Sequence, residues 1–321
     1  MTMIQTLELV PSPIALLRSR DIGNPEREIA AGRLIRVRRG VLAPRVAWTG
    51  LTPWDRYLAR VHAVGLVQPG VVFTHESAAA LWGMPLLGDP RVVHVTGDPS
   101  RTARLRGGIR VHTTTDDTEP LSAAGLLVAA PADTAVTIAR SRHPALALAC
   151  ADAACRLDPF LDHTILQARN EERPSSRGRR AARWSLERAT PLAESTLESM
   201  SRALIEWLGF PEPELQHPFP TARGGIEHAD FWWEWLGLVG EADGDLKYDG
   251  RFGDPLERLR ARRDRDMRML AGQASQVEHW GWTEMSLVAP VRAVLTGAGL
   301  RAVRPEDPAA LATFRALLSS S

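Results

Sequence analysis

The sequence lacks several features that define secreted and membrane proteins. Among 321 residues it has 2 cysteines, Cys150 and Cys155, too few for a disulfide scaffold and wrongly spaced for a zinc knuckle. No apolar run approaches the roughly 18–20 residues that a membrane helix needs. The N-terminus has no basic region followed by an apolar core, so it does not predict a signal peptide. These absences predict a reduced, cytoplasmic protein with no membrane segment.

Lysine is almost absent. Of the 39 basic residues, Lys247 is the only lysine. Such complete use of arginine indicates a GC-rich genome, and it leaves two interpretations of Lys247: retention for its chemistry, or chance. Apolar residues make up 44% of the chain and charged residues 24%, as in an ordinary globular protein. The length is sufficient for two or three domains.

The N-terminal segment is basic although the net charge of the whole chain is only +1. The pattern predicts a helix over Pro11–Arg20, a second over Glu26–Ala31, and a strand over Leu34–Arg38, which alternates with period two. Gly40 turns the chain before a further strand at Val41-Leu42. This order predicts a winged helix-turn-helix over residues 1–48. The candidate DNA-binding residues are Arg27, Arg33, Arg36, Arg38 and Arg39.

Residues 49–168 have the pattern of a middle α+β domain. The predicted helices and strands are Trp54–Val67, Ser77–Trp82, Val92–Thr96, Ile109–Thr113 and one or two helices over Pro131–Leu157. His94 and His112 fall on candidate neighbouring strands, and with His75 they raise the question of a metal site. No other residue supports ligation, so packing or surface positions are the favoured interpretation. The polar, basic segment 169–189 is predicted to be a linker.

Residues 190–321 predict a third domain with the order αβββαβ. The expected elements are a helix over Pro191–Leu208, strands over Glu214–Phe219, Glu227–Trp233 and Leu238–Asp243, a helix over Pro255–Leu270 and a strand over Gln276–Trp280. The arginines of the second helix would follow a phosphate backbone or form a solvated face, and the solvated face is slightly favoured.

The central hairpin of this domain predicts a cluster of carboxylates. If its turn centres between Trp235 and Leu236, Asp230 lies opposite Glu241. Alternation then places Asp243 on the same face, with His228 beside them. Directly opposed like charges are destabilising, so the cluster predicts a cation. Mg²⁺ is the natural candidate, because it takes carboxylate oxygens, water and substrate phosphate as ligands.

Other residues of the domain complete the candidate site. Lys247 follows Glu241 by six residues and would place its ammonium group near the water or the phosphate. Glu194 and Glu198 share a helix face, and either would supply a further oxygen. Glu198 has an alternative role in the capping box that begins at Ser195. Asp243 precedes a glycine, so turn formation is an alternative role for it.

The first half of the chain resembles the AbiEi-like antitoxins of type IV toxin–antitoxin systems. The resemblance rests on Arg27, on residues 32–41 (Gly-Arg-Leu-Ile-Arg-Val-Arg-Arg-Gly-Val) and on residues 74–85 (Thr-His-Glu-Ser-Ala-Ala-Ala-Leu-Trp-Gly-Met-Pro), and it covers about residues 10–165. It implies a winged-helix domain that binds operator DNA, followed by a domain needed for antitoxicity. A cognate toxin would be a partner.

The C-terminal segment is similar to very-short-patch-repair endonucleases of the PD-(D/E)xK class. The similarity rests on Glu198 with its helix, on Ala229-Asp230-Phe231, and on the segment from Gly240 to Tyr248. It implies a restriction-endonuclease-like fold in which Asp230 and Glu241 hold the metal, Glu198 is the acid on the helix and Asp243 is accessory. The E-x-K lysine position holds Asp243, so Lys247 would act from a displaced position.

Two functions follow from the sequence. The first is a DNA-binding protein with a Mg²⁺-dependent endonuclease-like domain, in phage defence or a toxin–antitoxin pair. The second is a non-enzymatic antitoxin and transcriptional autorepressor, in which the nuclease scaffold is degenerate. A structural or protein-interaction module is a third reading, and it requires the basic segments to bind nothing. The sequence does not give the oligomeric state.

Overall fold

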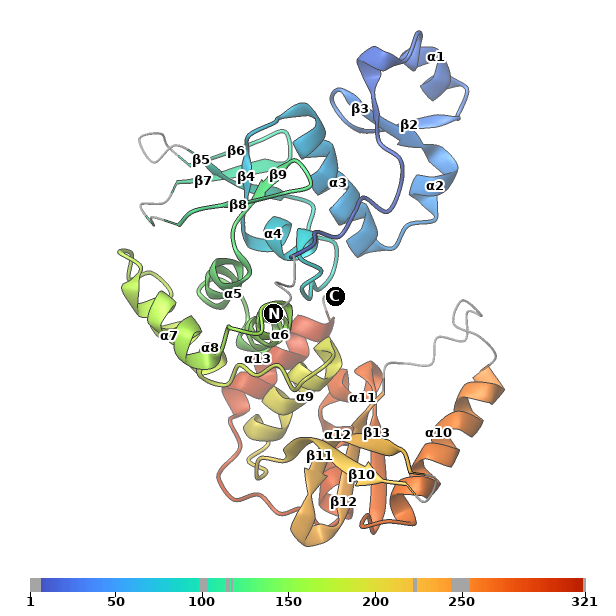
Figure 1. The fold of residues 1–321 in the computed structure, drawn as a ribbon, viewed down its shortest axis with the longest axis vertical. Coiled ribbons are helices and arrows are strands. Elements are labelled where there is room, and N and C mark those ends of the chain that lie inside the picture. Colours follow the sequence, from blue (N-terminus) through green and yellow to red (C-terminus); the bar gives the residue numbers. More distant parts are fainter. Residues whose placement is uncertain are drawn as a thin grey trace. The chain divides into compact units, whose positions relative to one another are not determined.

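The computed structural model describes residues 7–97, 103–113, 116, 118–221, 224–243 and 255–319. The chain divides into two compact units, one reaching to Pro191 and the other beginning at Leu192. The described residues form three sheets with helices packed on them (Figure 1). The prediction of a mixed α+β chain is therefore confirmed. Within the described residues, no helix combines the length and the apolar character needed to cross a membrane.

A small sheet opens the first unit. Its strands are β1 (Leu17–Arg18), β2 (Leu34–Arg38) and β3 (Val41–Pro44), in the antiparallel order β1-β3-β2. The helix α1 (Pro25–Ala30) precedes β2, and its N-cap Asn24 accepts a hydrogen bond from the amide of Arg27. The helix α2 (Arg45–Thr49) follows β3. Gly40 has a φ of +85°, which the turn between β2 and β3 requires.

The helix predicted over Pro11–Arg20 is wrong. This segment holds β1 and the 3₁₀ turn η1 (Ser19–Asp21), and the residues before them are not helical. Pro13 has no amide hydrogen and disfavours the helical conformation of Ser12, the residue before it. The amide of Val10 instead donates to the carbonyl of Leu81.

The larger sheet of the first unit has six strands in the order β6-β7-β5-β4-β9-β8. They are β4 (Val72–Phe73), β5 (Val93–Gly97), β6 (Arg104–Arg106), β7 (Ile109–Thr113), β8 (Leu121–Ala123) and β9 (Leu126–Val128). β5 and β7 are parallel neighbours. β6 was not among the predicted strands, because its three residues are exposed and too few to give a recognisable pattern.

Six helices accompany this sheet among the described residues of the first unit. They are α3 (Pro53–Val67), α4 (His75–Leu81), α5 (Pro131–Ala139), α6 (Pro144–Leu157), α7 (His163–Glu172) and α8 (Arg179–Glu187). Tyr57 of α3 and Leu81 of α4 are fully buried in the core that these helices share with the sheet. Cys150 and Cys155 are buried and unpaired, so neither forms a disulfide.

Residues 169–189, which we predicted to form a linker, contain the end of α7 and all of α8. Ala182 and Leu186, one helical turn apart, are buried in the core of the first unit. Basic residues of the segment have internal partners: Arg183 forms a bidentate hydrogen bond with Glu171. The high arginine content therefore reflects a charged outer face of packed helices.

The second unit has the element order αβββαβ followed by three helices. Its elements are α9 (Thr196–Trp207), β10 (Glu214–Pro220), β11 (Ile226–Trp233), η2 (Glu234–Leu236), β12 (Leu238–Ala242), α10 (Pro255–Leu270), β13 (Gln276–Trp280), α11 (Trp282–Leu287), α12 (Ala289–Gly297) and α13 (Pro308–Ser319). The sheet order is β10-β11-β12-β13, with β12 and β13 parallel and the other pairs antiparallel. The predicted strands and the helix Pro255–Leu270 match these bounds closely.

Helices pack on both faces of this sheet (Figure 1). Trp232 and Val239 form a buried cluster with Met269 of α10. The ring of Trp280 stacks on Phe231, and its Nε1 donates to Oγ of Ser201 on α9 at 2.8 Å. Alternate residues of each strand therefore serve the two faces, as the period-two pattern predicts.

The helix predicted to begin at Pro191 begins five residues later. Ser195 is the N-cap of α9, and its Oγ accepts a hydrogen bond from the amide of Glu198 at 3.1 Å. A serine side chain in this position satisfies an amide that lacks an intrahelical partner. The helix therefore begins after the cap at Ser195, and Pro191 lies before the helix.

Candidate functional site

Four acidic side chains line one cavity of about 470 Å³ in the second unit. Glu198 comes from α9, Asp230 from β11, Glu241 from β12, and Asp243 directly follows β12. Arg265 of α10 lines the same cavity. The structure thus brings these four predicted carboxylates together, three from the hairpin of β11 and β12 and one from α9.

The hairpin register explains how two of these acids meet. Phe231 pairs with Gly240 and Trp232 with Val239, which is the register predicted from a turn centred between Trp235 and Leu236. Continued by one residue, it places Asp230 beside Glu241. Oδ2 of Asp230 accepts a hydrogen bond from the amide of Ala242 at 2.9 Å, which fixes one of its oxygens.

Glu198 joins the site through a residue that sequence analysis missed. Its Oε2 accepts hydrogen bonds from the amide of Glu194 at 2.8 Å and from Nε2 of Gln216 at 3.1 Å. The same Nε2 lies 3.5 Å from Oδ1 of Asp230. Gln216 has a φ of +53°, a strained conformation for a residue other than glycine, and such residues cluster at functional sites. Glu194 is exposed and does not line the cavity.

Arg265 is the basic partner of the buried acids. Its Nη1 pairs with Oε2 of Glu241, and its Nη2 donates to the backbone carbonyl of His228. Glu241 is only 1% exposed, and its second oxygen, Oε1, has no hydrogen-bond partner among the described residues. A buried carboxylate oxygen without a partner is costly, so this atom is available for a ligand. His228 was expected beside the acids, but only its carbonyl takes part.

Asp243 is tied to the last strand and to α10. Its Oδ2 lies 2.6 Å from Nδ1 of His279 on β13 and 3.2 Å from Nε of Arg262. The other ring nitrogen of His279 lies 3.2 Å from the carboxylate of Asp266. His279 was not among the predicted site residues. It lies next to Glu241 only because β12 and β13 pair in parallel, and the sequence pattern does not indicate that pairing.

The electrostatics of the acids differ from one to the next. Burial, and then the charge of Glu198, raises the pKa of Asp230 well above the usual range of an aspartate. Burial and the charge of Asp230 likewise raise the pKa of Glu241, although Arg265 opposes this shift. Burial also acts on Asp243, but His279 and Arg262 outweigh it and hold its pKa below the usual value. Asp230 and Glu241 are therefore crowded carboxylates whose ionised forms need a positive partner.

These shifts give the second unit an expected pH dependence. A carboxyl whose pKa is raised in the folded state binds protons more tightly there, so stability falls as pH rises from about 4 through the raised values. We expect residues 192–319 to be more stable near pH 5 than near pH 8 in chelator-treated protein. The low pKa of Asp243 acts in the opposite sense, but only at and below pH 4.

Hydrogen exchange, corrected for the intrinsic effect of pH, would measure this stability in peptides of the second unit. Substitution of Asp230 by Asn should flatten the profile. An equally steep profile in the variant would contradict the assignment to this acid.

The remaining predicted residues lie elsewhere. Lys247 is outside the described residues. Four of the N-terminal arginines are exposed and Arg38 is half-buried. Arg33 pairs with Glu28 and Arg36 with Glu26. These ion pairs are exposed to solvent, so they hold the arginines only weakly.

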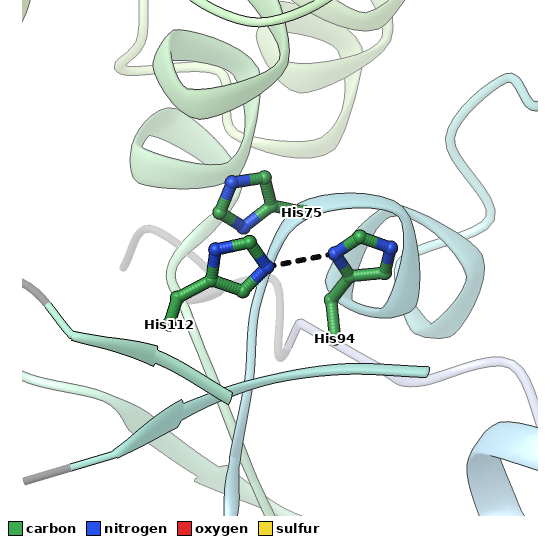
Figure 2. Close-up of side chains that lie close together, drawn as sticks. All are labelled: His75, His94 and His112. Carbon is green, nitrogen blue, oxygen red and sulfur yellow. Dashed lines mark hydrogen bonds between the residues drawn. The ribbon is translucent and has the colours of Figure 1, made fainter. Parts of the chain in front are cut away.

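A second cluster lies in the first unit, at the three histidines for which a metal site was considered and packing or surface positions were favoured. His75, His94 and His112 offer ring nitrogens that all lie within 4.8 Å of one another. Figure 2 shows the three rings side by side, with Nδ1 of His94 hydrogen-bonded to Nε2 of His112 at 2.8 Å. The rings of His75 and His112 stack with centroids 3.9 Å apart. His94 and His112 therefore lie on neighbouring strands, as expected, and His75 joins them from the start of α4.

The surroundings of the histidines hold them in place. The amide of His94 donates to Oγ of Ser77 at 2.7 Å, and Ser77 in turn contacts the hydroxyl of Tyr57. Burial lowers the pKa of His75 to about 2 and that of His112 to about 4, with the neighbouring histidines adding to both shifts. The rings are therefore neutral at pH 7.

The chain therefore carries an acidic cavity on the sheet of the second unit and a histidine cluster on the larger sheet of the first unit. The chain belongs to the same family as two proteins of Mycobacterium tuberculosis, "Uncharacterized protein MT2308" of strain CDC 1551 / Oshkosh and "Uncharacterized protein Rv2248" of strain ATCC 25618 / H37Rv. It is 30% identical to each over 262 residues, which cover 81% of this chain and 88% of the relative. No family model and no solved structure matches the chain.

Proposed function

We propose that the second unit is a metal-dependent nuclease domain that hydrolyses phosphodiester bonds in DNA. The observation that carries this proposal is the convergence of Glu198, Asp230, Glu241 and Asp243 on one cavity. The element order and the pairing of β12 with β13 agree with the restriction-endonuclease-like fold that the sequence resembles. Crowding buried carboxylates has no stabilising role of its own, because it raises their pKa values and weakens the fold.

The residues of the cavity fit Mg²⁺. The ion takes oxygen ligands from one or two carboxylates and completes its shell with water and substrate phosphate. Asp230 and Glu241 would hold it, and Oε1 of Glu241 is a buried oxygen without a partner among the described residues. When bound, the ion would supply Lewis-acid activation of water and stabilisation of the charge on the phosphate.

The chain's own residues position the acids and the substrate. Gln216 donates to Glu198 and lies near Asp230, so it holds these two carboxylates at a fixed separation. Arg265 neutralises Glu241 and would turn to a phosphate oxygen when a cation takes over that role. Asp243 remains ionised beside His279 and would orient water.

The N-terminal module would supply DNA affinity. Its sheet order β1-β3-β2, with η1 and α1 before the hairpin of β2 and β3, supports a small winged helix-turn-helix. Arg27 and Arg39 are exposed on α1 and on the turn of the hairpin, where they would contact phosphates. Operator binding and a place in phage defence or a toxin–antitoxin pair are part of this proposal.

Two observations favour a second candidate, a DNA-binding antitoxin without nuclease activity. The position of the E-x-K lysine holds Asp243, which pairs with His279 and Arg262. Arg265 already occupies one oxygen of Glu241. In this alternative the acidic cavity is a remnant, and the protein would repress its own operon or bind a toxin.

A cleavage assay separates the two candidates. The full chain would be incubated with supercoiled plasmid, linear duplex and single-stranded DNA in Mg²⁺ and in Mn²⁺, beside the variants Glu198→Gln and Glu194→Gln. We expect cleavage by the wild type and by Glu194→Gln, because Glu194 is exposed outside the cavity. Glu198→Gln should lose most of it. DNA binding without cleavage by any form would instead support the antitoxin.

The arginines of the N-terminal module have an expected effect on salt dependence. Each of the substitutions Arg27→Gln and Arg39→Gln should weaken DNA binding about equally for all sequences and reduce the salt slope of the affinity by about 1. Fluorescence anisotropy at several salt concentrations would measure this slope. Arg301→Gln, an exposed position in the second unit, is the matched control. Unchanged slopes in both N-terminal variants would place the DNA contact elsewhere.

A further inference from the structure

We propose that His75, His94 and His112 form a transition-metal site, occupied by Zn²⁺, in the first unit. The three residues come from the start of α4 and from the parallel strands β5 and β7 (Figure 2). Imidazole is the ligand that suits zinc and neighbouring transition metals, whereas Mg²⁺ prefers oxygen. The site is thus separate from the acidic cavity in both position and metal preference.

The spacing of the nitrogens suits a small ion. Zinc–nitrogen bonds are about 2.0–2.1 Å, which places two tetrahedral ligand nitrogens roughly 3.3 Å apart. The nitrogens of His94 and His112 are 2.8 Å apart, and all three ligand atoms lie within 4.8 Å of one another. Small rotations of the rings would therefore close the set around one ion.

His75 carries an independent sign of a missing ligand. Its Nδ1 is buried and has no hydrogen-bond partner among the described residues. A buried polar atom of this kind costs free energy unless a ligand satisfies it. The backbone of His75 has a φ of +51°, so the fold holds the residue in an uncommon conformation at the first position of α4.

Glu76 lies where a carboxylate could support His94 as a metal ligand. Its Oε2 lies 3.6 Å from Nε2 of His94, on the ring atom opposite the one that faces His112. This oxygen has no hydrogen-bond partner among the described residues, and a small ring movement would let it accept from Nε2 and leave Nδ1 free to bind a metal. Glu76 also pairs with Arg142, which offsets one of the positive charges near the cluster.

Three protein ligands leave the ion one open position. Structural zinc sites are closed by four side chains, whereas sites with three histidines keep the fourth position for water or another ligand. A water molecule or a small anion would take that position here. The ion would therefore be exchangeable with chelator.

Metal binding to the purified full chain tests this inference. Chelator-treated protein would be titrated with Zn²⁺ by calorimetry and, in parallel, with Co²⁺ while its visible absorption is recorded. We expect one Zn²⁺ per chain. Co²⁺ added to the chelator-treated protein should give the spectrum of a four-coordinate nitrogen site, and Zn²⁺ should then displace it. Glu76→Gln should weaken the affinity by about 10–100-fold, and His112→Ala by more than that.

The controls separate this site from adventitious binding. His163→Ala removes an exposed histidine of the same unit and should bind Zn²⁺ as the wild type does. Asp230→Asn should also bind as the wild type does, because it changes only the acidic cavity. Circular dichroism checks folding, and His75→Ala replaces His112→Ala if the latter does not fold. No stoichiometric binding by the wild type, or equal binding by His112→Ala, would overturn the proposal.

Discussion

Substitution of Asp230 by Asn is expected to abolish metal-dependent cleavage and, at the same time, to stabilise the protein. The carboxylate is one of the two proposed ligands of Mg²⁺, and loss of a ligand should reduce cleavage by at least about 100-fold. The asparagine Oδ1 can still accept the hydrogen bond from the amide of Ala242. The geometry of the hairpin should therefore survive the change.

The stabilisation follows from the electrostatics of the cavity. Burial and the charge of Glu198 raise the pKa of Asp230, so its ionised form destabilises the fold at neutral pH. A neutral asparagine removes this penalty, and we expect a gain of about 1–3 kcal/mol at pH 7.5 without divalent ions. Thermal unfolding with and without Mg²⁺ would measure it. A variant that is less stable than the wild type and retains full cleavage would contradict both the predicted stabilisation and the predicted loss of cleavage.

Substitution of Trp280 by Ala is expected to have the largest effect on stability. Trp280 is 2% exposed, stacks on Phe231 and donates a hydrogen bond to Ser201. Removal of a buried tryptophan leaves a cavity and costs about 3–5 kcal/mol. Denaturant unfolding followed by hydrogen exchange would assign this loss to peptides of residues 192–319.

Trp235 supplies the matched control for this experiment. Its side chain is 63% exposed, so Trp235→Ala should change the free energy of unfolding by no more than about 0.5 kcal/mol. A loss of similar size in both variants would mean that the packing of Trp280 on Phe231 does not stabilise the sheet.

The central hairpin could be predicted from the sequence because its strands and its turn are neighbours along the chain. The apolar run Phe231-Trp232-Trp233 and a short connection ending at Gly237 indicate a hairpin. A turn centred between Trp235 and Leu236 gives the pairing of Phe231 with Gly240, which is the observed register. Asp230 and Glu241 follow from it directly. The helix over Pro255–Leu270 was equally accessible, since Pro255 marks its first turn.

Contacts between segments that are distant in the sequence could not be predicted. Arg265 meets Glu241 only because α10 packs on the sheet, and Gln216 meets Glu198 across two elements. Neighbouring strands were expected for His94 and His112, but the approach of His75 depends on how α4 packs on these strands, which no short-range signal specifies. The many arginines of residues 169–189 indicated a linker. The structure instead has α8 there, with Leu186 buried in the core.

Calorimetric titration with Mg²⁺ tests the central claim most directly, because it asks whether the crowded acids hold a cation. The wild type, Asp230→Asn and His112→Ala would be compared after chelator treatment. We predict one Mg²⁺ site in the wild type and in His112→Ala, and none in Asp230→Asn, with all three proteins folded. Absence of binding in the folded wild type, or undiminished binding in Asp230→Asn, would contradict it.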